Sequence, residues 1–405
     1  LHTNFKLGGD GEFLGLIQPD GKTIASGFDP YPQQLTDHSY GRSSAAGNPP
    51  AYFSTPTPGK QNSAGFKGLV SDTEISSIRG LKENPFSASV TCSTSGVTVR
   101  YTTDGSLPSL ANGNTYSAPM TISKTTVLRT RAFKNSFIPS AITTKSFLFP
   151  ADIIRQPSNP PGFPQSWGKA PVADYEMDPD IANSTTYKGR IQDALRDIPS
   201  LSLAMNVNDV FGPLGIYSNP DWTGMPSERL TSMEFIDPDQ PSRNIHTDCG
   251  IRIQGGAGRF PDFSPKHSLS LRFRKTYGDG QLSRRLFPDS RVKEFDTLHL
   301  RSVFNNSWVM NLGLQRSRGQ MLHDQFARDS LIAMGQEDAC HGTFAHLYIN
   351  GLYWGIYNIH ERPSTAHYAN WHGGNEDDYD ARNGSTVTRG TAASWNQMVA
   401  TVKTQ

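Results

Sequence analysis

The sequence lacks the features that would place it at once in a special class of protein. It has no apolar run near the roughly 18 to 20 residues that a membrane-spanning helix needs, so no membrane span is expected. Lys and Arg total 38 against 37 for Asp and Glu, a balance that disfavours nucleic acid or an anionic membrane as a dedicated partner. The chain starts without an initiating Met or a signal peptide, which predicts that it begins inside a longer protein.

Cysteine is also scarce. Cys92, Cys249 and Cys340 lie far apart and follow no metal-ligand spacing, so neither a disulfide framework nor a cysteine metal site is expected. What the chain does contain is 37 glycines and 28 prolines, which indicate many turns between short strands. A length of 405 residues predicts two or three domains.

The first segment, residues 1–62, has two β-type runs on either side of Pro19-Asp20-Gly21, a turn signal that predicts a hairpin. Two polar motifs follow, YPQQLTDHSYGR at residues 31–42 and TPTPGKQN at residues 55–62. In this order the three features resemble the closing part of a lamin-tail domain, which implies an incomplete immunoglobulin-like β-sandwich.

The second segment, residues 66–149, repeats short runs rich in Val, Thr, Ile and Phe, as a β-sandwich does. Through YTTDGSLPS at residues 101–109 and the run TTVLRTRAF it resembles the C-terminal immunoglobulin-like domain of chitobiases and hexosaminidases. Asp104 lies directly before a glycine and is interpreted as a turn residue, with ligand or calcium binding as the alternative. The resemblance implies no glycosidase activity.

Residues 150–199 form a proline-rich connecting arm with one helical stretch, YKGRIQDALRDI, which we expect to pack on the third segment. From residue 200 to 405 the pattern becomes α+β. The run KHSLSLRFR alternates, so Leu269, Leu271 and Phe273 are predicted to face the core, and the residues between them to face water.

A helix is predicted at about residues 315–334, ended by Gly335. Its apolar stripe includes Leu322 and Phe326, and Asp329 falls in the same sector, whereas Asp324 points away. A carboxylate on an apolar stripe needs a cation. Lys266 is the predicted partner of Asp329, with Arg318 as the alternative.

Asn350-Gly351 between two alternating runs predicts a two-residue hairpin. This loop length pairs Ile349 with Leu352 and Tyr348 with Tyr353. It also pairs three further couples, namely Leu347 with Trp354, His346 with Gly355, and Ala345 with Ile356. The segment Glu361-Arg362-Pro363 then follows as a hinge.

This order, a glycine-rich turn, a strand with a lysine, a helix with an acid, a hairpin and a hinge, is that of the small lobe of a protein kinase. The motifs IRIQGGAGR, PKHSLSLRFR, FDTLHLRSVFNNSW and HLYINGLYWGIYNIHERP resemble the CotH family. That resemblance implies an atypical kinase fold that uses ATP and Mg²⁺. The residues predicted to hold the nucleotide are Gly255, Gly256, Gly258, Arg259, Lys266, Asp329 and Glu361.

Other interpretations stay open. The glycines can simply shape a turn, and Lys266 can be a solvated strand lysine. Asp378 and Asn383 have the spacing of a kinase catalytic loop, but NEDDYDARNG also reads as an acidic surface loop. The histidines between residues 341 and 372 show no zinc-site spacing and are interpreted as structural. No G-x-S-x-G hydrolase motif is present.

The expected fold is therefore two immunoglobulin-like sandwiches, the first incomplete, followed by an α+β kinase-like small lobe. The expected function is that of a secreted or cell-surface bacterial CotH-type protein, whose complete form phosphorylates Ser or Thr of surface proteins. The 42 residues after Pro363 are too few for a kinase large lobe, so this piece alone is expected to be inactive. The rival prediction is a non-catalytic adhesion or polysaccharide-binding protein.

Overall fold

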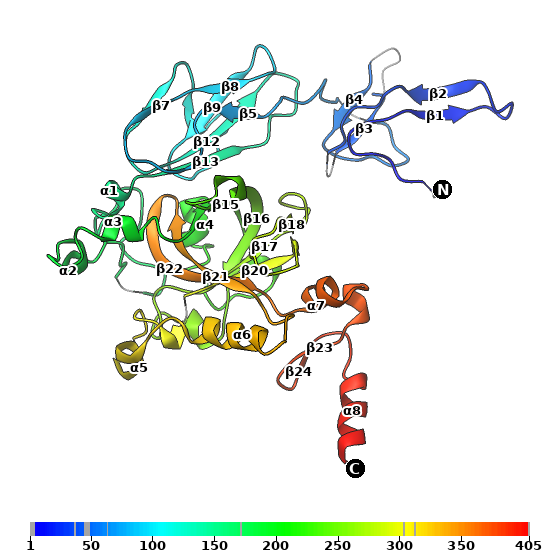
Figure 1. Cartoon of the computed structure of the whole chain (residues 1–405). Coiled ribbons are helices and arrows are strands. Elements are labelled where there is room, and N and C mark those ends of the chain that lie inside the picture. The colour runs from blue at the N-terminus through cyan, green and yellow to red at the C-terminus, as the bar shows by residue number, and fades with distance from the viewer. Residues whose placement is uncertain are drawn as a thin grey trace.

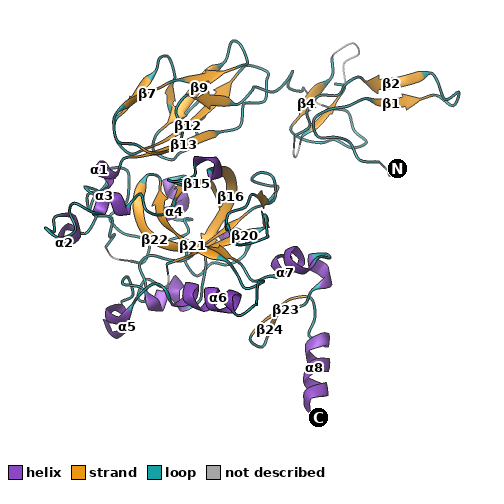
Figure 2. Ribbon diagram, in the orientation of Figure 1, coloured by secondary structure: helices purple, strands orange, loops and turns teal. Residues whose placement is uncertain are grey.

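The computed structural model describes residues 5–35, 38–43, 49–62, 64–170, 172–302, 304–311 and 313–403. Strands predominate over helices (Figure 2). A strand-rich module lies above a barrel, and the helices of residues 313–333 lie below the barrel (Figure 1). In the described part of the chain, no helix has both the length and the apolar character needed to cross a membrane.

The N-terminal segment has two strand pairs, β1 (Leu14–Ile17) with β2 (Ile24–Phe28) and β3 (Ser39–Gly41) with β4 (Ala51–Phe53). The predicted hairpin at Pro19-Asp20-Gly21 is confirmed. The Asp20 carboxylate accepts hydrogen bonds from the backbone N–H groups of Lys22 and Thr23 at 2.9 and 2.8 Å. Gly21 has a φ of +71°, a conformation that glycine adopts without a steric penalty.

The next part of the chain, residues 66–149, is called here the β-module. One five-stranded sheet, in the order β10-β9-β12-β13-β6, and two strand pairs, β11 with β7 and β5 with β8, enclose a core that includes Val90, Leu128 and Phe147. Asp104 accepts a hydrogen bond from the Ser106 backbone N–H at 3.0 Å, as the turn interpretation predicts. The strands are β5 (Thr73–Ile75), β6 (Gly80–Leu81), β7 (Phe86–Ala88), β8 (Val90–Cys92), β9 (Thr98–Thr102), β10 (Asn114–Thr115), β11 (Met120–Ile122), β12 (Thr126–Phe133) and β13 (Thr143–Leu148).

The connecting arm wraps along the barrel and contributes to its core. Its helices are short: α1 (Pro150–Ile153), α2 (Pro179–Ala182) and α3 (Ile191–Ala194). The predicted helical stretch YKGRIQDALRDI is thus mostly turns. Trp167 and Tyr175 of the arm are buried against Trp354 of the barrel, so the arm packs on the third segment.

Seven strands form a closed barrel in the order β14-β15-β16-β17-β20-β22-β21. β14 pairs antiparallel with β15 and parallel with β21, and this second pairing closes the barrel around an aliphatic and aromatic core. The strands are β14 (Ser200–Ala204), β15 (Arg229–Ile236), β16 (Ile245–Ile253), β17 (Leu269–Arg272), β20 (Thr297–Arg301), β21 (Gly342–Ile349) and β22 (Leu352–Glu361). Helix α4 (Val207–Phe211) and the pair β18 (Leu282–Ser283) with β19 (Glu294–Phe295) lie between them in the sequence.

The hairpin at Asn350-Gly351 is confirmed, but its register changes after two pairs. Ile349 pairs with Leu352 and Tyr348 with Tyr353, as predicted. A bulge follows, so Leu347 pairs with Gly355, His346 with Ile356 and Ala345 with Tyr357, and the three predicted pairings at these positions are wrong. Gly355 has a φ of +125°, which lets one extra residue enter the strand. The bulge places Trp354 and Tyr357 in the core.

The predicted long helix is two helices, α5 (Gly313–Arg318) and α6 (His323–Ala333). The helical conformation is interrupted between them, where Met321 has a φ of +60°. The predicted inward stripe is wrong, because Leu322 and Phe326 are 55% and 73% exposed. After the barrel come α7 (Thr365–His372), β23 (Ala381–Asn383), β24 (Thr386–Arg389) and α8 (Ala393–Lys403).

Candidate functional site

Alternate residues of β17, β20 and β22 point away from the barrel core and form one polar surface, called here the polar face. The strand register places Ser270 beside His299, and His299 beside His360. The prediction that this side of β17 faces water is wrong, since Ser270 and Arg272 are buried. The members of the polar face are Ser270, Arg272, Thr297, His299, Arg301, Asn358 and His360.

Helix α6 packs its polar side on this face. Arg301 forms an ion pair with Asp324 at 2.7 Å, and Asn358 donates a hydrogen bond to Gln325 Oε1 at 2.8 Å. Arg328 also contacts Asn358. The polar side of α6 therefore packs on the polar side chains of the strands, and its apolar side faces outward.

The predicted pairing of Lys266 with Asp329 is wrong. Asp329 is exposed and accepts a hydrogen bond from Gln325 Nε2 at 2.7 Å. Lys266 lies near Trp167 and Trp354, and the acid that acts on its charge is Asp174. A strand cation does meet an acid on the following helix, as in a kinase small lobe, but the two residues are Arg301 and Asp324.

The polar face carries hydrogen-bonding capacity that the described residues do not use. Solvent-shielded polar atoms in native proteins nearly always have a partner, so a group of them without one needs an explanation. Here six such atoms lie on the polar face and α6 without a hydrogen-bond partner among the described residues: Ser270 Oγ, Arg272 Nε, His299 Nε2, Asp324 Oδ2, Arg328 Nε and His360 Nε2. Of these, Asp324 Oδ2 takes part in the ion pair with Arg301.

Several arginines lie close together on and beside this face, and burial and their charges lower the pKa values of its basic groups. Burial first, and then the neighbouring Arg362, Arg272 and Arg301, lower the pKa of His299 to about 3. Burial and the nearby Arg252 and Arg362 lower the pKa of Arg272 to about 10, and Asp296 partly opposes that shift. The histidine is therefore neutral and the arginine charged at neutral pH, so the face favours an anion.

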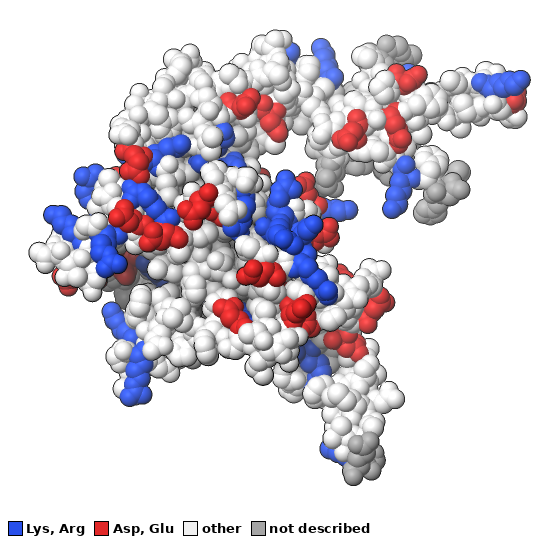
Figure 3. Space-filling view, viewed as in Figure 1, with Lys and Arg blue, Asp and Glu red and all other residues white. Residues whose placement is uncertain are grey.

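A pocket of about 570 Å³ opens where this face meets the segment after β22, and is called here the arginine pocket. Two of its arginines have acidic partners, Arg274 with Glu228 at 2.8 Å and Arg389 with acids of residues 376–377. Arg272 and Arg362 form no ion pair with any residue that the structure describes. Figure 3 shows Lys and Arg gathered on the surface between β18 and α7.

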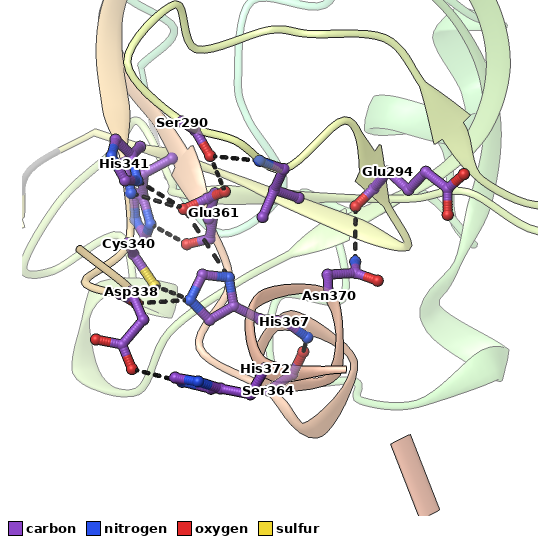
Figure 4. A network of polar contacts seen from close by, with 12 residues as sticks. Ser290, Glu294, Asp338, Cys340, His341, Glu361, Ser364, His367, Asn370 and His372 are labelled. Atoms are coloured by element: carbon purple, nitrogen blue, oxygen red, sulfur yellow. Dashed lines mark hydrogen bonds and ion pairs between the residues drawn. The ribbon is translucent and has the colours of Figure 1, made fainter. Parts of the chain in front are cut away.

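Glu361, predicted to contact the nucleotide, instead anchors the hinge. Its carboxylate accepts a hydrogen bond from the His341 backbone N–H at 2.7 Å and lies 3.9 Å from His367 Nδ1 on α7. Ser290 Oγ lies 3.4 Å from the other carboxylate oxygen (Figure 4). Glu361 is 1% exposed and does not line the arginine pocket, so it positions the segment that does.

The predicted glycine-rich turn lies at the opposite end of the polar face. Gly255 has a φ of +119°, and the space around Gly255 and Gly256 is open, whereas a Cβ on Gly258 would meet Phe304. The Arg259 guanidinium donates to the backbone oxygens of Gly255 and Pro220. The contacts of Arg259 thus stabilise the loop.

The other candidate groups have ordinary partners. Asp378 accepts a hydrogen bond from the Asn375 backbone N–H at 2.7 Å, which caps a short helical turn in an exposed loop. His346 contacts Tyr353, and His372 contacts Asp338. Among the residues that the structure describes, no three His, Cys, Asp or Glu side chains form a group that could hold a metal ion.

Sequence reasoning missed Arg272, Arg301, Asp324 and Arg362. The sequence contained a signal for Arg301 and one for Arg272. Arg301 lies at the end of the strand within FDTLHLRS, which is followed by the two helices. The signal for Arg272 was its alternation with Leu271 and Phe273. That pattern predicted an outward side chain but not its burial.

We expect acid to destabilise the barrel through its neutral histidines. Burial lowers the pKa of His267 to about 4 and that of His299 to about 3, so the unfolded chain takes up these protons first. The two neutral histidines contribute fully to the free energy of unfolding above the usual histidine pKa of about 6.5. That contribution is lost as the pH falls below this value. We expect the free energy of unfolding, measured with urea, to fall less between pH 7 and 5 in His299→Gln than in the parent. The exposed His323→Gln should show the same fall as the parent. Equal slopes for both variants and the parent would contradict this expectation.

Comparison with protein families gives two matches and confirms both corresponding resemblances. Residues 251–403 match the model described as CotH kinase protein, and residues 80–144 match the chitobiase/beta-hexosaminidase C-terminal domain. A search of curated proteins finds no match. The polar face and the arginine pocket both lie within the CotH match.

Proposed function

We propose that this chain belongs to a CotH-type, kinase-like protein whose arginine pocket binds the phosphates of ATP. The complete protein, on this proposal, transfers phosphate to Ser or Thr of proteins at a bacterial surface. The observation that carries the proposal is the position of Arg272 and Arg362. Both guanidinium groups lack an ionic partner among the described residues, and both line the pocket beside the predicted hinge.

The chemistry of the pocket suits phosphate. A guanidinium group presents planar paired donors that match two phosphate oxygens, and it stays charged. Arg272 already donates to Thr297 Oγ1 at 2.9 Å, which orients its group, while its Nε has no partner. Phosphoryl transfer depends mainly on positioning and charge neutralisation, so two arginines in one pocket, one of them oriented by Thr297, are useful parts of such a site.

The residues fit the phosphates of ATP better than they fit a metal ion. Bound ATP would supply the phosphoryl group, and Arg272 and Arg362 would hold its oxygens. Mg²⁺ commonly uses one or two carboxylates together with substrate phosphates. Two residues with carboxylates line the arginine pocket, but Glu376 lies 3.5 Å from Arg389 and Asp296 accepts a hydrogen bond from Thr297 at 3.0 Å. We therefore assign no Mg²⁺ ligand and route no step through the metal.

A binding titration tests this proposal without requiring turnover. We expect ATP to bind the chain and Arg362→Gln to weaken the affinity about tenfold to a hundredfold, because a charge-assisted hydrogen bond is lost. The matched control is Arg284→Gln, since Arg284 is exposed and its one hydrogen bond among the described residues goes to the adjacent Ser283 carbonyl. Isothermal titration calorimetry gives each Kd.

Two outcomes would contradict the proposal. If ATP does not bind, or if Arg362→Gln and Arg284→Gln bind it equally well, the pocket is not a phosphate site. The rival role as a non-catalytic adhesion or polysaccharide-binding protein then gains support. A surface location and a protein acceptor are parts of the proposal that rest on the CotH and chitobiase-type matches.

A further inference from the structure

A second hollow, of about 720 Å³, lies at the other end of the barrel and is called here the lysine cavity. Lys266 precedes the first residue of β17, whereas Arg272 of the arginine pocket is its last, so the two hollows are separated by the length of the strand. Trp308, Met321 and Ile356 give the cavity apolar walls. Its volume falls in the range of small-molecule sites, about 300 to 1,000 Å³.

One wall of the lysine cavity is acidic and comes from the connecting arm. Buried Ala173 and Tyr175 alternate with exposed Asp174 and Glu176, because the buried residues anchor the arm in the barrel core. Asp178 and Asp180 continue the acidic wall, and all four carboxylates line the cavity. Asp178 is partly used, since it accepts a hydrogen bond from the Asp180 backbone N–H at 2.9 Å.

The cavity also holds donors without acceptors. The Lys266 ammonium lies 5.6 and 5.8 Å from the ring centres of Trp354 and Trp167 and donates no hydrogen bond to a described residue. Ser307 is 1% exposed, and its hydroxyl has no partner within the described part of the chain. Burial lowers the pKa of Lys266, and Asp174 opposes that shift.

We infer that the lysine cavity binds a diamino acid, which carries one carboxylate and two ammonium groups and so has a net positive charge. The carboxylate accepts hydrogen bonds from Lys266 and Ser307, and the ammonium groups meet Asp174, Glu176 and Asp180. The aliphatic chain of the ligand packs on the apolar wall. This ligand class is independent of the proposed function, because no phosphate and no residue of the arginine pocket takes part.

Charge favours this class over simpler ligands. Four carboxylates and one ammonium line the cavity, so a ligand with net positive charge is attracted and a phosphate is repelled. A diamine without a carboxylate would satisfy the acids but would place another cation near Lys266 with no acceptor for it. A diamino acid satisfies both sets of groups, and exposed Trp308 can add a cation–π contact to one ammonium.

Calorimetric titration with L-lysine tests the inference, and 1,5-diaminopentane is the matched probe because it lacks only the carboxylate. We expect L-lysine to bind, and the diamine to bind about tenfold to a hundredfold more weakly, since a charged hydrogen-bonding group is lost. A tripeptide Gly-Gly-Lys presents the same carboxylate on a chain end. If Gly-Gly-Lys binds more tightly than L-lysine, the natural ligand is the C-terminus of a peptide and not the free amino acid.

Two variants locate the binding. Lys266→Met keeps the unbranched stem of the side chain without its ammonium group and should remove the preference for L-lysine over the diamine. Glu176→Gln, at an exposed position, should weaken both ligands, while Glu83→Gln on the β-module should weaken neither. Unchanged melting temperatures verify folding. If L-lysine fails to bind, if the diamine binds as tightly, or if both cavity variants bind like the parent, the inference is wrong.

Discussion

Replacing Trp354 by Ala is expected to lower the free energy of unfolding of the barrel by about 3 to 5 kcal/mol, the usual cost of truncating a buried aromatic residue. Trp354 is fully buried, and its ring centre lies 4.7 Å from that of Trp167. Its Nε1 donates a hydrogen bond to the Tyr217 hydroxyl at 3.1 Å. The substitution therefore leaves a cavity where the arm meets the barrel and removes one hydrogen-bond partner of the Tyr217 hydroxyl.

Trp308→Ala is the matched control, because Trp308 is 58% exposed. A substitution at such a position usually changes stability by less than about 0.5 kcal/mol. Urea unfolding followed by near-ultraviolet circular dichroism gives both values. A loss for Trp354→Ala no larger than that for Trp308→Ala would mean that the arm does not contribute to the barrel core.

Arg79→Ala is expected to cost about 3 to 5 kcal/mol at neutral pH, as breaking a buried ion pair generally does. Arg79 belongs to the β-module, and its Nε lies 2.5 Å from Glu234 Oε1 on β15 of the barrel. Glu234 is 1% exposed, and Ser146 of β13 also donates to its carboxylate. Without Arg79, a buried carboxylate remains between the β-module and the barrel, and among the described residues Ser146 is left to donate hydrogen bonds to it.

The pH dependence of this loss has a definite sign. Burial raises the pKa of Glu234, and Arg79 opposes that rise, so removing Arg79 raises the pKa further. A carboxyl group whose pKa is raised on folding favours the folded state at low pH and loses that contribution as pH rises through the folded pKa. The cost of Arg79→Ala should therefore be largest at neutral pH and shrink as pH falls toward 4.5.

A double-mutant cycle isolates the pair. In a Glu234→Gln background the carboxylate that pairs with Arg79 is gone, so Arg79→Ala should cost less than about 1 kcal/mol. Urea unfolding of the four proteins at pH 7 provides the cycle. Equal losses in both backgrounds would show that Arg79 acts through packing and not through Glu234.

Local chemistry allowed several elements to be predicted. The turns at Pro19-Asp20-Gly21 and Asn350-Gly351 depend on residues within the turn, so their sequences identify them without knowledge of the fold. The bulge at Gly355 was missed because the hydrophobic alternation in this strand is compatible with two pairing registers, one with an extra residue and one without. Closure of the barrel was also missed, because β14 and β21 lie far apart in the sequence.

The residues of the candidate site were not predicted. The sequence indicated that Asp329 holds Lys266, whereas in the structure Asp329 accepts a hydrogen bond from Gln325 and the ion pair between strand and helix is that of Arg301 with Asp324. Helical periodicity assumes that the apolar stripe faces inward. That assumption fails for α6, because the surface beneath it carries Arg301 and Asn358 and so prefers the polar side of the helix.

The parallel pairing of β14 with β21 has a consequence for biosynthesis. β14 can join β15 soon after both leave the ribosome, but its other edge stays unpaired until β21 has been made. Pairings between distant segments form slowly, and an open strand edge invites association with other chains. Nascent chains that stall before residue 342 should therefore be more prone to misassembly than those that have passed residue 361.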